Sequence, residues 1–422
     1  MSFNELVLKK YSQTKKHVLF EELQKECLNN FTDLGIPKSK DEKWKYINVS
    51  SFLKKELSFN LSSNKKLKKN KETNKIVFYN GKLQKELSSV QNKNILFFEF
   101  NDAVKKQEKI LRKIINYNKS NYDSTCFLNT AFLNESFLLI IVKENTKINE
   151  TLEILHLYDS ENEAICNQRK IFYINKNCEI NIVEKTENIG KKYIFCNSMN
   201  EFLCDSRSFV NYYKTQDNEN MSIIDNSFIN IKKESSFSNH TYSFKGDLIR
   251  NNIYADLTEE NSNVNLYGIS FLKNKSIVDN YTYIKHLVPN CFSNELYKGM
   301  YDEHSRGVFC GKILVEKDAQ KTNAFQQNNN LLLDRNSTIN TKPQLEIFAD
   351  DVKCSHGCTV GQLDNNSLFY LRSRGIPKKE AKALLTYAFA NNVLESVKIP
   401  ILKKRIKSLI ANKLGVNLVY DL

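Results

Sequence analysis

The spacing of apolar residues changes twice along the chain and divides it into three parts. Between residues 3 and 30, apolar side chains recur three or four positions apart among Lys, Glu and Gln, which predicts helix. Residues 102–119 repeat this amphipathic pattern. From about residue 126 to residue 350 the pattern alternates with a period of two, which is typical of β-strands. After residue 360 the helical spacing returns.

The alternating region consists of many short segments. In one of them, Ile253, Ala255 and Leu257 fall on one face of a strand and polar or aromatic residues fall on the other. The connectors are short and rich in Asn, which tolerates the left-handed backbone conformation of tight turns. Many short strands indicate a β-sandwich, barrel or solenoid. The Asn-rich connectors favour the solenoid, although the pattern alone leaves a sandwich open.

Local signals predict several element ends. Asn80-Gly81, between two short apolar runs, predicts a β-hairpin. Asp364 can cap the first turn of one helix, and Pro400 can open a later helix that ends before Gly415.

We therefore expect three domains. The first is mainly helical and covers residues 1–125, with a Lys-rich linker at 62–75. A β-solenoid core follows at 126–360, and a helical domain at 361–422. Because the end strands of a β stack expose unpaired backbone groups, we expect the helical domains to cap its ends.

Charge and composition narrow the function classes. The formal charge is +14, but the densest basic run, at 64–75, contains no aromatic side chain on which a base could stack, so we expect no nucleic acid binding. No apolar run approaches the roughly 20 residues of a membrane span, and the N-terminus lacks the apolar core of a secretory signal. The ten scattered cysteines are then expected to be reduced thiols in a cytoplasmic protein.

One short stretch carries candidate chemistry. Cys354, His356 and Cys358 stand at alternate positions, so a strand would present all three on one face. Thiolates and an imidazole suit zinc or an iron–sulfur centre, yet a structural zinc site usually has four ligands. Cys310 or His304 could complete the set in space. From the residues alone, packing, zinc binding, a transient cluster contact and a Cys–His nucleophile all stay open.

Two longer segments are more specific. Residues 345–389, which contain the run KCSHGC, and residues 286–333 resemble the C-terminal part of the SufB/SufD family of iron–sulfur cluster assembly proteins. The motif DEKWKY at 41–46 is similar to an N-terminal motif of that family. SufB-type chains carry a cysteine where this chain has Leu371. Within the family, the chain therefore most resembles the SufD type.

The resemblance carries expectations about fold and function. It implies a right-handed parallel β-helix flanked by helical domains. It also implies a non-catalytic scaffold subunit of a SufBCD complex, partnered by a SufB-like chain and a SufC-like ATPase, with a homodimer as the state in isolation. An iron–sulfur cluster would be held transiently within the complex, which has also been connected with a flavin. No cofactor would be permanently bound to this chain.

The resemblance also suggests residue roles. His356 and Cys354 match family positions at the interface with the SufB-like chain, near the proposed cluster site, and Cys358 is a candidate third ligand. The C-terminal helices are the expected contact of the ATPase. One apolar stripe there is expected first as a core face and second as a partner surface; it consists of Leu384, Leu385, Ala388 and Phe389.

Two other function classes fit a basic β-solenoid less well. A polysaccharide-active enzyme would need clustered carboxylates on one face, and Asp350 and Asp351 are the only close pair near the motif. A nucleic-acid-binding protein would show strongly salt-dependent affinity, but the chain lacks interleaved basic and aromatic residues.

Overall fold

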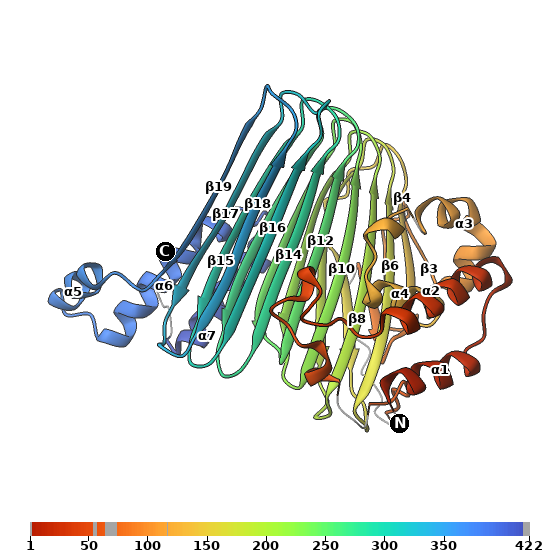
Figure 1. Ribbon diagram of the computed structural model, residues 1–422, viewed down its shortest axis with the longest axis horizontal. Helices are drawn as coiled ribbons and strands as arrows, with labels where there is room; N and C mark the ends of the chain where they lie inside the picture. Colours follow the sequence, from red (N-terminus) through yellow and green to blue (C-terminus); the bar gives the residue numbers. More distant parts are fainter. Residues whose placement is uncertain (1, 54–56, 64–73, 116, 417–422) are drawn as a thin grey trace.

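Two large sheets form the body of the protein (Figure 1). The computed structural model describes residues 2–53, 57–63, 74–115 and 117–416, so most of the predicted linker at 62–75 lies outside the described residues. The odd-numbered strands other than β3, together with β2, form a ten-stranded sheet, and the other even-numbered strands and β3 form a nine-stranded one. From β4 onward, each strand pairs in parallel with the strand two places along the chain. This arrangement confirms the solenoid.

The element bounds are as follows. The ten-stranded sheet contains β1 (Lys75–Tyr79), β2 (Lys82–Leu83), β5 (Leu152–Tyr158), β7 (Glu179–Asn188), β9 (Phe209–Asp217), β11 (Ser236–Lys245), β13 (Asn263–Leu272), β15 (Phe292–Tyr301), β17 (Asn323–Leu332) and β19 (Lys353–Gly361). The nine-stranded sheet contains β3 (Ile95–Phe98), β4 (Phe137–Val142), β6 (Ala164–Ile174), β8 (Ile194–Cys204), β10 (Met221–Ile231), β12 (Leu248–Leu257), β14 (Ile277–His286), β16 (Arg306–Val315) and β18 (Thr338–Ile347). The α-helices are α1 (Phe3–Gln13), α2 (Glu21–Leu34), α3 (Phe100–Ile114), α4 (Ser124–Ala131), α5 (Asn365–Ser373), α6 (Lys378–Glu395) and α7 (Pro400–Leu414).

The turns along one edge share a backbone conformation. The residue with positive φ in each turn is Asn145, Asn177, Arg207, Glu234, Asn261, Asn290 or Lys321. Several of these residues donate their backbone N–H to a carbonyl of the next turn, as Asn290 does to Gln320 at 2.9 Å. Since Asn adopts this conformation more readily than most residues, the Asn-rich connectors are explained by the fold.

The inward-facing side chains, at alternate positions of each strand, fill the interior between the two sheets. One long apolar core runs through successive turns, with members such as Phe172, Phe202, Ile229 and Ile253. Phe172 and Phe202 stack with ring centroids 4.3 Å apart. Stacking of like side chains on neighbouring parallel strands therefore joins one turn to the next.

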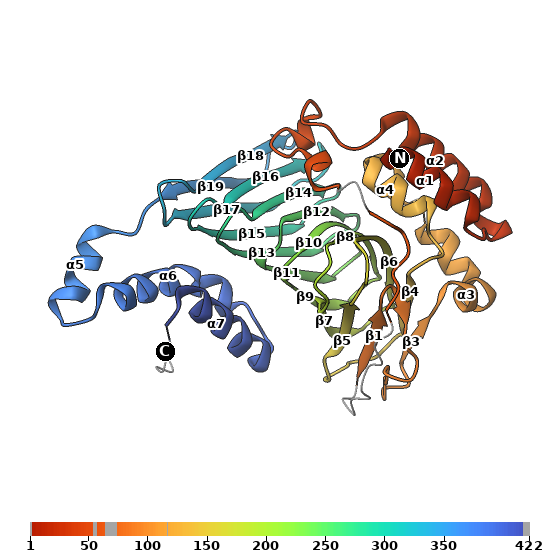
Figure 2. The ribbon, with the colours of Figure 1, turned by 90° about the horizontal axis from the view of Figure 1, so that it is seen from below.

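Helices cover the outer faces of the sheets rather than their ends. The N-terminal helices lie against the nine-stranded sheet, where Phe31 and Phe132 share a core with Ile224. Helices α6 and α7 lie against the ten-stranded sheet, where Val393 and Ile406 pack with other apolar residues of that face (Figure 2). The expectation that helices cap the ends of the stack is therefore wrong for the C-terminal domain, because its apolar side chains pack onto a sheet face.

The two ends of the solenoid differ. At the first end, β2 pairs antiparallel with β1, and β3 pairs antiparallel with β4. Strands β1 and β3 thus complete the two sheets, although they fall within the region predicted as the N-terminal helical domain. At the other end, β18 and β19 each have one paired neighbour, and neither has a fully buried residue. Within the described part of the chain, this end of the stack is open.

Most local signals agree with the structure. The Asn80-Gly81 turn joins β1 to β2 with positive φ at both residues. The Asp364 side chain accepts from two backbone N–H groups at the start of α5, and Pro400 opens α7. Gly415 ends α7 in the left-handed conformation. Among the described residues, no helix has the length and apolar character needed to cross a bilayer.

Candidate functional site

The last strand, β19, carries the predicted site residues at the open end. Cys354, His356 and Cys358 pair in register with Ala324, Gln326 and Asn328 of β17. Cys354 packs against the interior apolar core, so the two residues that follow it at alternate positions face the same way, toward the space above the last turn. The strand geometry therefore places all three side chains on the inward face of the end strand.

The three side chains have different surroundings. Cys354 is half-buried, and this burial raises the pKa of its thiol. His356 is exposed. The exposed Cys358 lies 3.2 Å from the hydroxyl oxygen of Thr341 on β18, as a donor to that oxygen. A thiol with a raised pKa is a weak nucleophile, so the half-buried Cys354 is not an activated one.

The three residues do not form a closed metal centre by themselves. Alternate positions on a strand lie roughly 6.6 Å apart, which is too far for one ion to bind all three. Among the described residues, no group of three or more His, Cys, Asp or Glu side chains is close enough to hold a metal ion. Cys310 lies on the opposite face of its sheet from the inward Phe309, and His304 lines a cavity at an edge of the solenoid. Neither completes the set.

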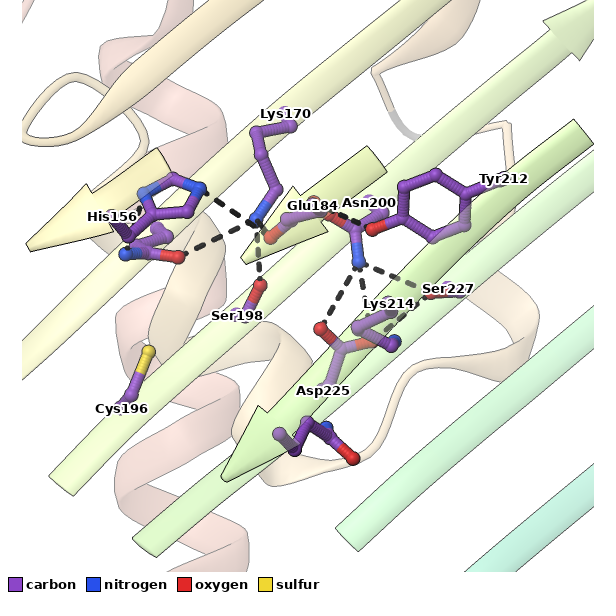
Figure 3. Close-up of polar contacts among 12 residues, drawn as sticks. His156, Lys170, Glu184, Cys196, Ser198, Asn200, Tyr212, Lys214, Asp225 and Ser227 are labelled. Carbon is purple, nitrogen blue, oxygen red and sulfur yellow. Dashed lines mark hydrogen bonds and ion pairs between the residues drawn. The ribbon is translucent and has the colours of Figure 1, made fainter. Parts of the chain in front are cut away.

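A second polar cluster lies deep in the solenoid, and the sequence did not predict it. Lys170 Nζ lies 2.6 Å from Glu184 Oε1 and 3.1 Å from Ser198 Oγ (Figure 3). The Tyr212 hydroxyl donates to Glu184 Oε2 at 2.5 Å, and His156 Nε2 lies 3.4 Å from Oε1. Both sheets therefore supply partners to one buried carboxylate.

The cluster continues into the neighbouring turn (Figure 3). Asp225 forms an ion pair with Lys214 and accepts from Asn200 Nδ2, with both oxygens 3.2 Å away. Asn200 Nδ2 also donates to Ser227 at 3.1 Å. Lys170, Glu184, Lys214 and Asp225 in this cluster each have an opposite charge beside them, which is the condition under which buried charges persist.

Electrostatics fix the charge states of the cluster. Burial alone would raise the pKa of Glu184, but Lys170 and His156 hold that pKa below its usual value. Burial, reinforced by Lys170, lowers the pKa of His156. Glu184 is thus ionised and His156 neutral at pH 7. A cluster of this kind stabilises one arrangement of the sheets and holds no free nucleophile.

The DEKWKY segment fastens the N-terminal region to the solenoid. The guanidinium carbon of Arg250 lies 4.4 Å from the centre of the Trp44 ring, and Arg250 Nη2 donates to the Lys43 carbonyl at 2.8 Å. Arg250 also forms a buried ion pair with Asp279. Trp44 Nε1 donates to Asp123 at 3.2 Å. This motif therefore has a structural role.

The predicted apolar stripe on α6 differs from the face of this helix that packs on the sheet. The face of α6 that packs on the sheet is formed by Tyr387, Ala390, Val393 and Leu394. The predicted stripe lies beside it: Leu384, Leu385 and Phe389 are half-buried and Ala388 is exposed. Phe389 also packs against this core, so the first reading, as the core face, holds for Phe389. The role of the stripe as a partner surface stays a prediction.

Helix α5 is the most exposed of the C-terminal helices. It contains no fully buried residue, and Phe369 and Tyr370 are 73% and 57% exposed. Figure 2 shows this helix projecting from the body. An exposed apolar surface of this kind is typical of a protein–protein contact.

The fold and the end site together define a class of protein. It is a two-sheet parallel β-solenoid with helices on both outer faces, one completed end, and one open end that carries two thiols and an imidazole.

Family models identify the chain more closely. The model for "SUF system FeS cluster assembly, SufBD core domain" matches residues 156–389, which is more than half of the chain. The model for "SufBD protein N-terminal region" matches residues 7–154. The chain belongs to the SufBD family.

Individual relatives agree with this assignment. The "Iron-sulfur cluster assembly protein SufD" of Escherichia coli (strain K12) is 36% identical over 184 residues, which is 44% of each chain. The "Iron-sulfur cluster assembly SufBD family protein slr0076" of Synechocystis is 30% identical over 283 residues, or 65% of this chain and 62% of the relative. "Protein ABCI7, chloroplastic" of Arabidopsis thaliana is 29% identical over 270 residues, which is 61% of this chain and 56% of the relative. The matches thus span about half the length of these relatives.

Proposed function

We propose that this chain is a SufD-like, non-catalytic scaffold subunit for iron–sulfur cluster assembly, working in the cytoplasm. The observation that carries the proposal is the open end of the solenoid, where Cys354, His356 and Cys358 face inward on a strand with one free edge. Iron and sulfide are the cargo of such a subunit. Soft thiolate and imidazole ligands suit them, and a site that a partner must complete can release what it holds.

The partners are a SufB-like chain and a SufC-like ATPase. A strand edge with free N–H and C=O groups can bind another strand, so the SufB-like chain would add to β18 and β19. The ATPase would contact the C-terminal helices through α5 and the stripe on α6. In isolation, two copies of this chain would pair through the same open strands. A flavin on the complex stays a prediction, which the absorbance spectrum of the purified complex would check.

The experiment is anaerobic co-expression with a SufB-like and a SufC-like chain, followed by size-exclusion chromatography and measurement of bound iron and sulfide. We expect one complex containing all three proteins. His356→Ala should leave this complex intact and lower its iron and sulfide severalfold. His304→Ala is the matched control, because His304 is exposed at an edge of the solenoid. The proposal would be overturned if the chain did not co-elute with either partner, or if the His356→Ala complex bound as much iron as the wild type.

A further inference from the structure

One buried carboxyl group in the interior lacks the partner that the others have. Six carboxylate side chains are buried among the described residues. Five of them form ion pairs with Lys or Arg: Glu184, Glu201, Asp205, Asp225 and Asp279. The sixth, Glu295 on β15, is fully buried with no such ion pair. Its burial raises the pKa of the carboxyl group to about 7, although Thr282 and Gln326 partly oppose this.

Glu295 instead holds the side-chain amide of Gln326. Gln326 Nε2 donates to Glu295 Oε2 at 2.6 Å, and Gln326 is 1% exposed. This oxygen accepts whether the group is ionised or carries its proton on Oε1, so the amide nitrogen must point toward Glu295. The amide oxygen, Gln326 Oε1, is left without a hydrogen-bond partner. A buried acceptor of this kind is costly unless something donates to it.

His356 occupies the next position in register after Glu295 and Gln326, on the last strand. Glu295, Gln326 and His356 are paired directly in register on β15, β17 and β19. All three side chains lie on the inward face, and neighbouring strands are about 4.8 Å apart. An imidazole is therefore the nearest side chain above Gln326 toward the open end.

The opposite sheet leaves room for this arrangement. Gly311 of β16 faces inward, and a Cβ added there would overlap the Gln326 amide. Glycine inside a strand often marks a close approach by another group. The position is thus matched to the amide that Glu295 orients.

We propose that Glu295 and Gln326 are positioning residues for His356, with Gln326 Oε1 accepting the N–H of one imidazole nitrogen. This hydrogen bond selects one tautomer and turns the other nitrogen, with its lone pair, toward the open end. Histidine ligands of metals are commonly oriented in this way by an acceptor behind them. The inference rests on the proposed function, because His356 would use this lone pair to bind iron that is held only within the complex.

The first test needs no cluster. The full chain, labelled with ¹⁵N at histidine, is studied by NMR at pH 8, and His356→Ala assigns the His356 signals. The wild type should show one dominant His356 tautomer. Glu295→Gln should give a mixture of the two His356 tautomers, because it allows the Gln326 amide to flip. Gln326→Leu should also give a mixture, because it removes the acceptor. Asn330→Ala is the matched control, because Asn330 is buried on the same strand but lies opposite Val360. A wild-type mixture, or an unchanged tautomer in both variants, overturns the inference.

The second test uses the complex. Glu295→Gln and Gly311→Ala should lower its iron affinity about tenfold, while Asn330→Ala keeps wild-type affinity. Gly311→Ala alters no polar group, so it carries the test if Gln326→Leu does not fold. Loss of iron in His356→Ala with wild-type affinity in Glu295→Gln and Gly311→Ala would defeat the inference and leave the proposed function standing. Full iron in His356→Ala would defeat both.

Discussion

Lys170 and Glu184 meet 2.6 Å apart inside the solenoid, where both side chains are almost completely withdrawn from solvent. The two residues come from opposite sheets, so their ion pair joins the sheets across the interior. Buried charges are costly to leave unpaired, which makes this pair a sensitive point of the fold.

Lys170→Met should destabilise the protein by about 3–5 kcal/mol, because it leaves the Glu184 carboxylate buried without its main partner. Urea unfolding followed by circular dichroism measures the change. The double variant Lys170→Met/Glu184→Leu should recover most of the loss, since no unpaired charge remains. A single variant within about 1 kcal/mol of the wild type would contradict the buried ion pair.

The turns with positive φ along one edge predict a contrast between two substitutions at Asn290, whose φ is 60°. Asn290→Gly should change the free energy of unfolding by only a few tenths of a kcal/mol, roughly the difference between two residues that tolerate this conformation. Asn290→Val should cost about 1–2 kcal/mol, because a β-branched residue resists it. Thermal unfolding of both variants provides the comparison, and equal stabilities would refute the role of the turn conformation.

His286 predicts how stability depends on pH. Its Nε2 lies 2.8 Å from Ser293 Oγ, and burial lowers the pKa of the imidazole to about 3. Below pH 6.5 the unfolded chain therefore binds a proton that the folded chain does not, so stability present above pH 6.5 is lost as pH falls toward 3.

The variant His286→Gln isolates this contribution. The slope of unfolding free energy against pH between 6 and 4 should decrease by about 1 kcal/mol per pH unit. Urea unfolding at several pH values gives the slope. The exposed His304→Gln should leave it unchanged, and an unaltered slope in His286→Gln would show that His286 titrates normally.

The proposed contact with the ATPase can be tested on α6. Ala388 is exposed between half-buried apolar residues of the predicted stripe, so Ala388→Arg should abolish co-purification of the SufC-like protein while leaving the circular dichroism spectrum unchanged. Lys404→Ala, at an exposed position on α7, is the control and should retain binding. Retention of the ATPase by Ala388→Arg would place the contact elsewhere, with α5 the next surface to vary.

The sequence predicted best those features that depend on local conformation. The Asn80-Gly81 hairpin and Pro400 follow from backbone preferences, the Asp364 cap from a local side-chain hydrogen bond, and the strands from the alternating apolar pattern. That Cys354, His356 and Cys358 share one face of a strand followed from strand periodicity, whereas the inward direction of that face came from the packing of Cys354 in the structure. The ligand role of these residues could not be decided in the same way, because it depends on a surface that another chain would complete.

The buried polar cluster and the packing face of α6 could not be predicted in this way, because they depend on which face of an element packs against another. Both faces of strands such as β10 are buried, so a period of two cannot separate a polar residue in the interior from one in solvent. Lys170 was missed for this reason, because β6 is buried on both faces in the same way. Glu184 follows Ile180 and Ile182 at alternate positions on β7, so the pattern could have placed it on the inward face. The closely spaced Ala and Leu residues of α6 offer two apolar faces, and the sequence does not say that Tyr387 rather than Leu384 meets the sheet.

The unequal ends of the solenoid limit how these chains can associate. A stack with two open ends could add subunits indefinitely and grow into a filament. Here the edge strands at the first end are short, with two residues in β2 and four in β3, whereas β18 and β19 at the other end offer free edges of ten and nine residues. Edge-to-edge addition would therefore stop once a second solenoid has joined, so strand pairing would yield a discrete two-chain unit rather than a polymer.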